Sequence, residues 1–225
     1  MFCTNCDKES DSLSLKDPVC DCCGFDNSYV LQLIEENDDE LETEDEIRSS
    51  VECAQRSVIL FGLVSAGNGE DRDAIVAWLK KEALWEYVTE EEKAFFESQQ
   101  LTKRSVINAT WRIESLAVLL WALYKLPAFN NFSELCDLDA IKNACDFYLK
   151  ESKNFIENAE LRSDDEIFDA NELIYDSHWK VRDATINHQP IPEEIDSSIV
   201  QERHHAINWL IGYCGQEWDE ITTDT

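Results

Sequence analysis

The stretch "ATWRIESLAVLLWALY", residues 109–124, decides the class of fold. From Leu116 onward its residues are apolar on nearly every side of a helix, which is typical of a helix buried at the centre of a bundle. The apolar run is about half the length that a membrane-spanning helix requires. No proline occurs between Pro18 and Pro127, so a long helix can form without interruption. We therefore expect a central helix over residues 102–125.

Further helices are expected on both sides of this central helix. Three Ser/Thr-x-x-Glu capping boxes predict helix starts, at Thr43, Thr89 and Ser163. The expected helices cover residues 47–66, 71–88, a short segment after Thr89, a segment from Asp137 or Asp139, residues 163–186, and a segment from Ser198 to near Gly212 or Gly215. No useful length of sequence alternates with the period of a strand. The sequence therefore predicts an all-α fold, a compact multi-helix domain that follows a small N-terminal module.

The charge balance limits the classes of partner. The chain has 225 residues, with 48 acidic against 19 basic ones and a formal net charge of −29. Binding to phosphate backbones or anionic membranes requires clustered Lys and Arg, and the sequence has no basic run. We expect no nucleic-acid partner and no membrane partner. The acidity either keeps the protein soluble and monomeric or suits a basic protein partner.

The cysteines and the N-terminus indicate a compartment. The chain begins without the basic region and apolar stretch of a secretory signal. Nine cysteines are an odd number, and five of them lie within the first 23 residues. This usage is typical of reduced thiols rather than of a disulfide scaffold. We expect a cytoplasmic protein.

The N-terminal cysteines have the spacing of a metal site. They form two Cys-x2-Cys pairs, Cys3 with Cys6 and Cys20 with Cys23. Tetrahedral Zn²⁺ takes four thiolates, and each pair can present two of them from one turn. Gly24 suits the positive φ with which such a turn often ends. Because four cysteine ligands leave no open position for water or substrate, the predicted role of the zinc is structural.

Two alternatives to this ligand set remain open. A rubredoxin-like iron site is the second choice, weakened because Asp7 rather than Gly follows the first pair. Cys22 is spare in the four-cysteine scheme and can replace Cys20 as a ligand. The predicted organisation is a zinc-ribbon-like module over residues 1–30, an acidic linker over 31–46, and a helical domain over 47–225.

Four motifs of the body resemble a known family. They are "ATWRIESLAVLLWAL" (109–123), "LRSDDEIFDANELIYDSHWKVRDA" (161–184), "VQERHHAINWL" (200–210) and "WDEITTDT" (218–225). In order, spacing and final position they are similar to the bacterial domain of unknown function 4272. The resemblance covers about residues 55–225 and leaves the zinc-ribbon-like module and the linker outside the family pattern. It implies a compact helical fold and no particular activity.

The polar residues in these motifs are the candidates for chemistry. They are Arg112, Glu114, His178, Arg182, Glu202 and Arg203. In a structural interpretation they neutralise one another across a helix bundle, because buried charges must be paired. In a hydrolase-like interpretation Glu114 or Glu202 is a general base, His178 is an acid, and the arginines bind an anion.

Neighbouring aromatic and histidine residues complete the two interpretations. The hydrolase-like pocket would be ringed by Trp111, Trp121, Trp179 and Trp209. Metal binding by His178, His204 and His205 is the weaker option, because the side chains of adjacent helical residues point about 100° apart. We expect a non-catalytic protein-interaction or regulatory protein, of which an acidic inhibitor that mimics nucleic acid is a variant. The enzyme remains the alternative.

Overall fold

The computed structural model describes residues 5–6, 18–28, 46–128 and 131–225. The predicted ligand Cys3 and the predicted helix cap Thr43 lie outside these ranges. The chain divides into two compact units, Met1–Glu44 and Asp45–Thr225, each with its own internal contacts.

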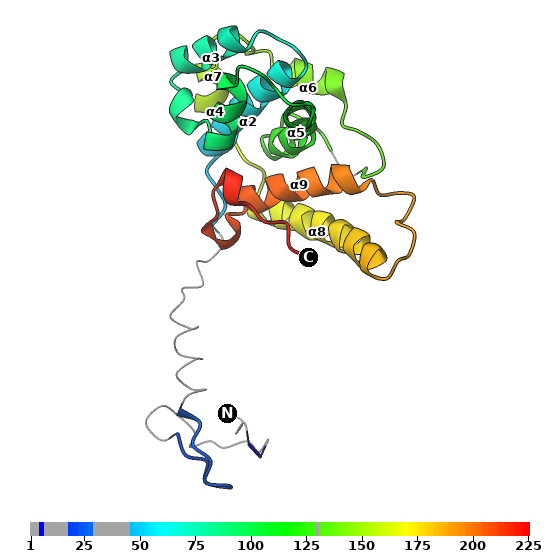
Figure 1. Cartoon of the computed structure of the whole chain (residues 1–225). Helices are drawn as coiled ribbons and strands as arrows, with labels where there is room; N and C mark the ends of the chain where they lie inside the picture. Colours follow the sequence, from blue (N-terminus) through cyan, green and yellow to red (C-terminus); the bar gives the residue numbers. More distant parts are fainter. Residues whose placement is uncertain (1–4, 7–17, 29–45, 129–130) are drawn as a thin grey trace. The chain divides into compact units, whose positions relative to one another are not determined.

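The larger unit consists of helices joined by loops and turns over its described length (Figure 1). Its helices are α2 (Ser50–Gly67), α3 (Arg72–Lys81), α4 (Glu90–Glu97), α5 (Lys103–Ala122), α6 (Leu138–Ala144), α7 (Lys153–Glu157), α8 (Asp164–Ile186) and α9 (Ser197–Leu210), with 3-10 turns at η1 (Trp85–Tyr87), η2 (Tyr213–Gly215) and η3 (Trp218–Glu220). The described residues contain no strand, and their β-type pairing is limited to two isolated bridges. The all-α prediction is confirmed.

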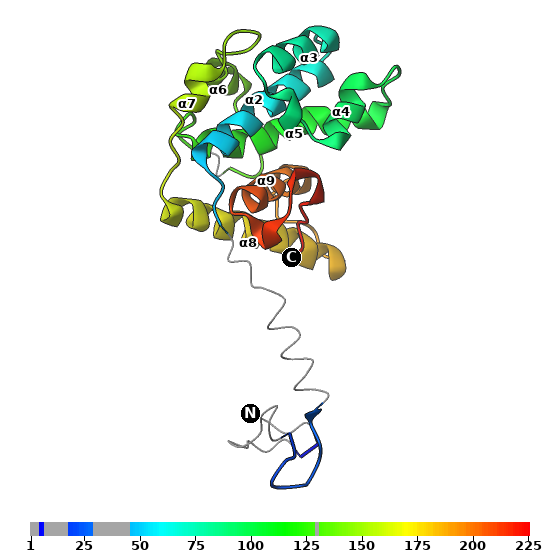
Figure 2. The same ribbon diagram turned by 90° about the vertical axis from the view of Figure 1, so that its left-hand side faces the viewer.

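Helix α5 lies at the centre of this body, as its apolar sequence predicts. It packs against α2 on one side and against α9 on the other, and α9 in turn packs against α8. Figures 1 and 2 show α9 between α5 and α8 in both views. Every residue from 114 to 123 is buried, including Leu116, Leu119 and Leu120. Arg112 and Glu114, which shortly precede Leu116, therefore lie where the helix enters the core.

Two helix starts differ from the predicted ones. Helix α2 begins after Ser49, whose side chain forms a capping box with Glu52, rather than after Thr43. Helix α9 begins after Asp196, whose carboxylate accepts hydrogen bonds from the backbone N–H groups of Ser198 and Ile199. The predicted starts at Thr89 and Ser163 are confirmed by complete capping boxes.

Two further elements differ from the predicted pattern. Helix α3 ends at Lys81 instead of continuing to residue 88, because Ala83 takes a left-handed backbone conformation with φ 57°. A 3-10 turn then covers Trp85–Tyr87. The short helix α7 was not expected, since five residues are too few to show a helical period.

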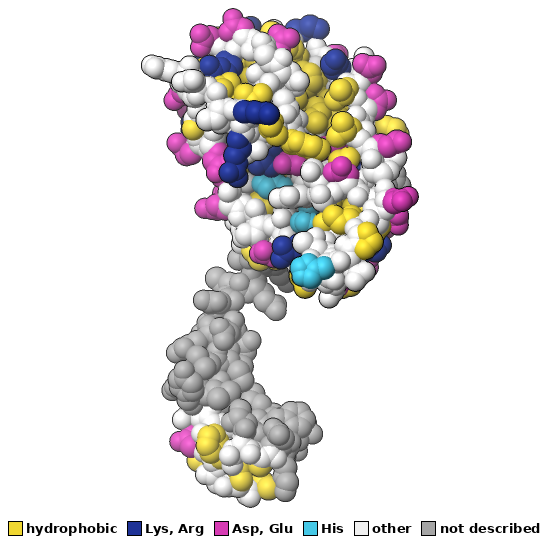
Figure 3. Space-filling view, turned by 45° about the vertical axis from the view of Figure 1, so that its right-hand side comes forward, with side chains coloured by type: hydrophobic (Ala, Val, Ile, Leu, Met, Phe, Trp, Pro, Cys, Tyr) yellow, Lys and Arg dark blue, Asp and Glu magenta, His cyan; other side chains and the backbone are white. Residues whose placement is uncertain are grey.

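The surface of the body is acidic, and no described helix combines the length and apolar character of a membrane span. Asp and Glu side chains are spread over the face drawn in Figure 3. They belong to the large excess of acidic over basic residues in the chain. Few charged residues are buried inside the body, and these buried residues are the starting point for the candidate site.

Candidate functional site

Three of the four predicted metal ligands are described, and their sulfur atoms gather at one point. The Sγ atoms of Cys6, Cys20 and Cys23 all lie within 4.8 Å of one another. The Sγ atoms of Cys6 and Cys20 are 3.9 Å apart. Four thiolates around one tetrahedral ion at about 2.3 Å have sulfurs separated by about 3.8 Å. The three sulfurs therefore have the spacing of ligands that share an ion.

A tight turn in the backbone brings two of these cysteines together. The N–H of Gly24 donates to the carbonyl of Cys20 at 2.8 Å, and the N–H of Cys20 donates to the carbonyl of Phe25 at 2.9 Å. Gly24 has φ 70°, the positive value expected from the sequence. A non-glycine residue would strain this turn. The turn places the side chains of Cys20 and Cys23 on the same side of the chain.

The other polar groups of this unit support the cluster from outside. The side-chain amide of Asn5 donates to the Sγ of Cys23 at 3.7 Å. Cys22 is exposed and is not among the three clustered sulfurs, whereas Cys20 is buried. Cys20, not Cys22, therefore supplies the sulfur at this position of the cluster. The fourth ligand, predicted to be Cys3, stays a prediction.

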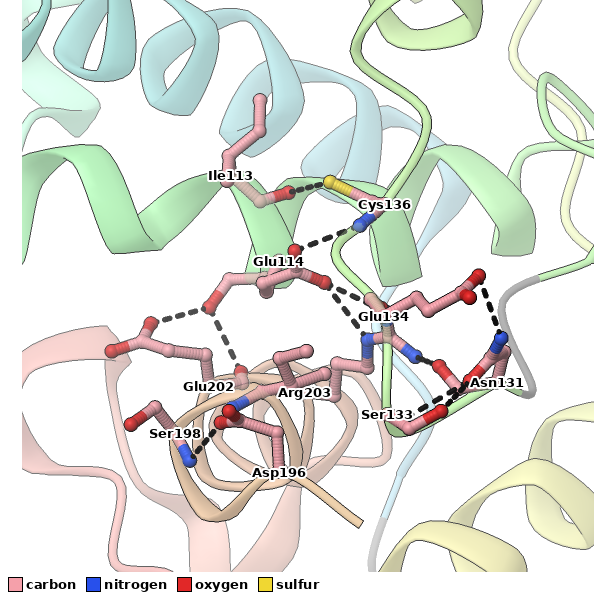
Figure 4. Close-up of polar contacts among 12 residues, drawn as sticks. Ile113, Glu114, Asn131, Ser133, Glu134, Cys136, Asp196, Ser198, Glu202 and Arg203 are labelled. Carbon is pink, nitrogen blue, oxygen red and sulfur yellow. Dashed lines mark hydrogen bonds and ion pairs between the residues drawn. The ribbon is translucent and has the colours of Figure 1, made fainter. Parts of the chain in front are cut away.

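In the helical body, the most buried polar contact is an ion pair between α5 and α9. Glu114 and Arg203 are 0% and 1% exposed. One carboxylate oxygen, Oε2, accepts hydrogen bonds from Nε and Nη2 of Arg203 at 3.0 and 2.7 Å. The other, Oε1, accepts from the backbone N–H of Cys136 at 2.9 Å, and Nη1 of Arg203 donates to the carbonyl of Asn131 at 2.6 Å (Figure 4). Both buried charges are thus paired and hydrogen-bonded.

A second ion pair lies next to the first on the same two helices. Nη1 of Arg112 is 3.1 Å from Oε2 of Glu202, and both side chains are about a fifth exposed. The hydroxyl of Ser115 donates to the carbonyl of Glu202 at 2.9 Å and lies 3.1 Å from its carboxylate. Four of the six candidate residues therefore form two neighbouring, neutralised pairs between α5 and α9.

The other two candidate residues lie apart from these pairs. His178 on α8 faces His204 on α9, with 2.7 Å between their Nδ1 atoms. One of the two Nδ1 atoms must carry a proton and donate a hydrogen bond, and the other must be unprotonated and accept it. Arg182 is exposed on α8. The structure therefore gives His178 a histidine partner, rather than the glutamates with which the hydrolase-like interpretation placed it.

Burial keeps these histidines neutral. The pKa of His204 is lowered to about 4, chiefly by desolvation and next by the neighbouring His178. The pKa of His178 is lowered by burial and then by the charge of Arg182. His205, on the adjacent position of α9, has its pKa lowered to about 3, chiefly by burial and next by Arg112. All three side chains favour the uncharged form.

The three histidines do not converge on one point. The ring of His205 packs edge-on against Trp218, with 4.7 Å between the ring centroids, while His204 faces His178. The divergence agrees with the angle expected between adjacent helical residues. Among the described residues, the cysteine cluster is the one group of three or more His, Cys, Asp or Glu side chains with ligand atoms close enough to share an ion.

Of the four tryptophans in the predicted ring, two pack against other groups and a third is half exposed. Trp179 is half exposed on α8, and Trp121 lies under the guanidinium of Arg162 at 4.8 Å. Trp209 packs against Trp218, with 5.3 Å between the ring centroids. The expected helical period placed these residues correctly on helices. The helical period does not show which neighbouring helix packs on which face.

Sequence reasoning missed a third ion pair, which lies near Trp218. Nη1 of Arg56 contacts both carboxylate oxygens of Glu92 at 2.8 and 2.9 Å, and both residues are buried. The guanidinium of Arg56 lies 5.1 Å from the ring centroid of Trp218, and that of Arg112 lies 5.8 Å from it. The sequence predicts Glu92 only as part of a capping box, which it also completes. The sequence carries no signal that Glu92 is buried beneath the C-terminal motif.

The fold and the site together define a class: a helical protein whose buried charges are paired, joined to a small unit with clustered cysteines. Comparison with known families then identifies it. The sequence profile of the family described as "Domain of unknown function (DUF4272)" matches residues 24–221, and the chain belongs to that family. The match begins well before residue 55, so it includes the acidic segment that the sequence interpretation had left outside the family pattern. No protein of curated function and no solved structure is significantly similar to the chain.

Proposed function

We propose that this chain is a non-catalytic protein-interaction or regulatory protein whose N-terminal unit is organised by a structural zinc ion. The observation that carries the proposal is the convergence of the sulfur atoms of Cys6, Cys20 and Cys23 within 4.8 Å. A small unit with few apolar residues cannot fold on hydrophobic burial alone. Metal binding would supply the missing folding free energy.

The donor set favours zinc as the ion. Thiolates are soft ligands that select zinc or iron, and a tetrahedral four-sulfur site is typical of both. With Cys3 as the fourth ligand, the ion would have no open coordination position. Zinc in such a closed site has a structural role and activates no water. Asn5, by donating to the Sγ of Cys23, would stabilise the negative charge of that ligand.

The buried and paired state of the charged residues in the body supports an interaction role rather than catalysis. A general base must reach the proton that it abstracts. Glu114 is excluded from solvent and already accepts hydrogen bonds from Arg203 and from the backbone of Cys136. An acidic surface on a chain of net charge −29 complements a basic protein partner and repels nucleic acid.

Metal analysis of the full chain tests the zinc site. We expect about one zinc ion per chain by native mass spectrometry and elemental analysis. Cys6→Ser and Cys20→Ser should each release the ion, because each removes one of the clustered sulfurs. Cys22→Ser is the matched control and should retain it, whereas Cys3→Ser should release it if Cys3 is the fourth ligand. A full chain that is purified without metal and cannot take up zinc would contradict the proposal. A full chain purified with iron would show that the resident ion is iron and not zinc.

The interaction role needs a separate experiment. The full chain and the double variant Cys6→Ser/Cys20→Ser are compared for the proteins that they capture at low and at high salt. A basic partner should be captured by the full chain and released by salt, because exposed charges are screened. Loss of capture in the variant would place binding on the cysteine unit, and equal capture would place it on the helical body. If neither protein captures a salt-sensitive partner, the interaction role is wrong.

A further inference from the structure

Helix α8 carries a row of large, partly exposed apolar side chains on the side away from its buried face. Within this row, the ring of Tyr175 also meets His204 of α9 edge-on, with 5.9 Å between the ring centroids. The exposed fractions are 42% for Phe168, 41% for Tyr175, 49% for Trp179 and 67% for Ile186. The opposite side of the helix is buried through residues such as Ile174 and Val181, and α9 packs against α8. Single exposed apolar residues are ordinary on a protein surface, but four in one row on one helix mark an interaction site.

The row has the spacing of a coiled-coil seam. Its positions are Phe168, Glu172, Tyr175, Trp179, Arg182 and Ile186, with steps of four and three residues in strict alternation. This is the a/d pattern of a heptad repeat. Glu172 and Arg182 fill the two positions that are not apolar, and both side chains are exposed. The seam therefore consists of two apolar pairs and one pair of opposite charges.

The seam is also complementary to itself when its direction is reversed. Phe168 and Ile186 are equally far from Ser177 along the helix, as are Glu172 and Arg182, and as are Tyr175 and Trp179. Two copies of α8 packed antiparallel, with a twofold axis at Ser177, would place each residue opposite the other member of its pair. A twofold interface requires this property of a surface.

We propose that this face of α8 is the contact surface of an antiparallel homodimer. Each interface would contain Phe168 against Ile186 of the second copy, Glu172 against Arg182, and Tyr175 against Trp179, each of them twice. A parallel pair would instead place Glu172 against Glu172 and Arg182 against Arg182, and like charges in a seam are destabilising. The charge pair therefore selects both the direction and the register of the two helices.

The helix dipole and the acidic first turn of α8 are compatible with the same direction. Its first turn contains Asp164, Asp165 and Glu166, whereas its second half contains Lys180 and Arg182 together with Asp176 and Asp183. In an antiparallel pair, the acidic first turn of one helix lies beside a second half with no net charge, and the two helix dipoles oppose each other. The net charge of −29 on each chain works against association. The contact must therefore come from the seam rather than from overall charge.

The size of the seam predicts a weak dimer. Each of the four exposed apolar side chains offers about 100 Å², so two copies would bury about 800 Å² through them, before flanking residues are counted. Stable interfaces usually bury about 1,200–2,000 Å². We expect a dimer that dissociates in the micromolar range. The inference is independent of the zinc site, because it depends only on α8.

Analytical ultracentrifugation of the full chain over a wide concentration range tests the dimer. The wild-type chain should shift from monomer to dimer as its concentration rises. Trp179→Ser should weaken association roughly tenfold or more, because it removes a central aromatic contact. Leu173→Ser is the matched control: Leu173 is an exposed apolar residue of α8 that lies outside the seam, and its loss should leave association unchanged. A wild-type chain that stays monomeric at every concentration overturns the proposal.

Charge exchange tests the direction and register. Glu172→Arg places two arginines in each charge pair, and Arg182→Glu places two glutamates there, so each variant alone should be monomeric. An equal mixture of the two variants should form a heterodimer, because every charge pair is then opposite again. Glu97→Arg, an exposed change elsewhere on the body, should leave association unchanged. If either single variant associates as the wild type does, or if the mixture fails to associate while both variants keep the wild-type helical content and melting temperature, the proposed register is wrong.

Discussion

The two sides of helix α9 hold their polar groups in different ways. On the side of α5, Glu114 and Arg203 are charged, buried and paired through several hydrogen bonds. On the side of α8, His178 and His204 are buried and share a single contact between two Nδ1 atoms. Buried groups of the first kind must stay charged in the presence of the partner, whereas those of the second kind must stay neutral. One helix thus combines a charge-paired interface and an interface sensitive to protonation.

The charge-paired side should give the largest effect when it is broken. Glu114→Gln removes the negative charge and leaves the guanidinium of Arg203 buried without a counterion. An unpaired buried charge costs about 3–5 kcal/mol of stability. We expect a loss of that size in the free energy of unfolding, measured by urea denaturation with circular dichroism.

A nearby carboxylate provides the control for this variant. Glu134 is exposed, and its side chain accepts from the amide of Asn131 rather than from Arg203. Glu134→Gln should leave the unfolding midpoint close to that of the wild type. Equal stability losses in the two variants would show that burial does not make the Glu114–Arg203 pair special.

The protonation-sensitive side should respond to pH. The pKa values of His204 and His205 in the folded protein, about 4 and about 3, lie below the ordinary value near 6.5. Below pH 6.5 the unfolded chain therefore binds protons that the folded chain rejects. The stabilisation is complete above that pH and is lost as the pH falls, at no more than about 1.4 kcal/mol per pH unit for each histidine.

This slope is measured through the free energy of unfolding between pH 7.5 and pH 4.5. His204→Asn should flatten it, because one titrating group is removed. His188→Asn, which replaces an exposed histidine on the segment after α8, should leave the slope as it is. A wild-type stability that is constant across this range would mean that the buried histidines do not reject protons.

Most of the fold could be predicted from the sequence, because its signals are local. The apolar run after Leu116 identified the central helix, and the capping boxes at Thr89 and Ser163 marked two helix starts correctly. The start of α2 was misplaced because Thr43 and Ser49 carry equivalent capping signals. A long-range contact distinguishes them: the backbone N–H of Arg48, beside the true start, donates to the carbonyl of Leu210.

The residues of the site could be predicted from the sequence better than their contacts with one another. The sequence places Glu114 and Arg203 on apolar helix faces, so a buried ion pair could be expected. The contact between His178 and His204 depends on the register of α8 against α9, which no local pattern encodes. By contrast, Cys20 and Cys23 were predictable as neighbours from their Cys-x2-Cys spacing, because the turn that joins them is local, and Cys6 lies with them as the paired spacing predicts.

The smallest effect is expected where the α5–α9 interface opens to solvent. Arg112 and Glu202 are each about a fifth exposed, so water already stabilises part of their charge. A double-mutant cycle of Arg112→Met and Glu202→Gln isolates their coupling from the other contacts of each residue. We expect a coupling energy of about 1 kcal/mol, which decreases as salt is added. A coupling as large as the loss caused by Glu114→Gln would mean that the partial exposure of this pair to water does not weaken it. The graded loss of stability along α9 would then have to be attributed to hydrogen-bond geometry rather than to burial.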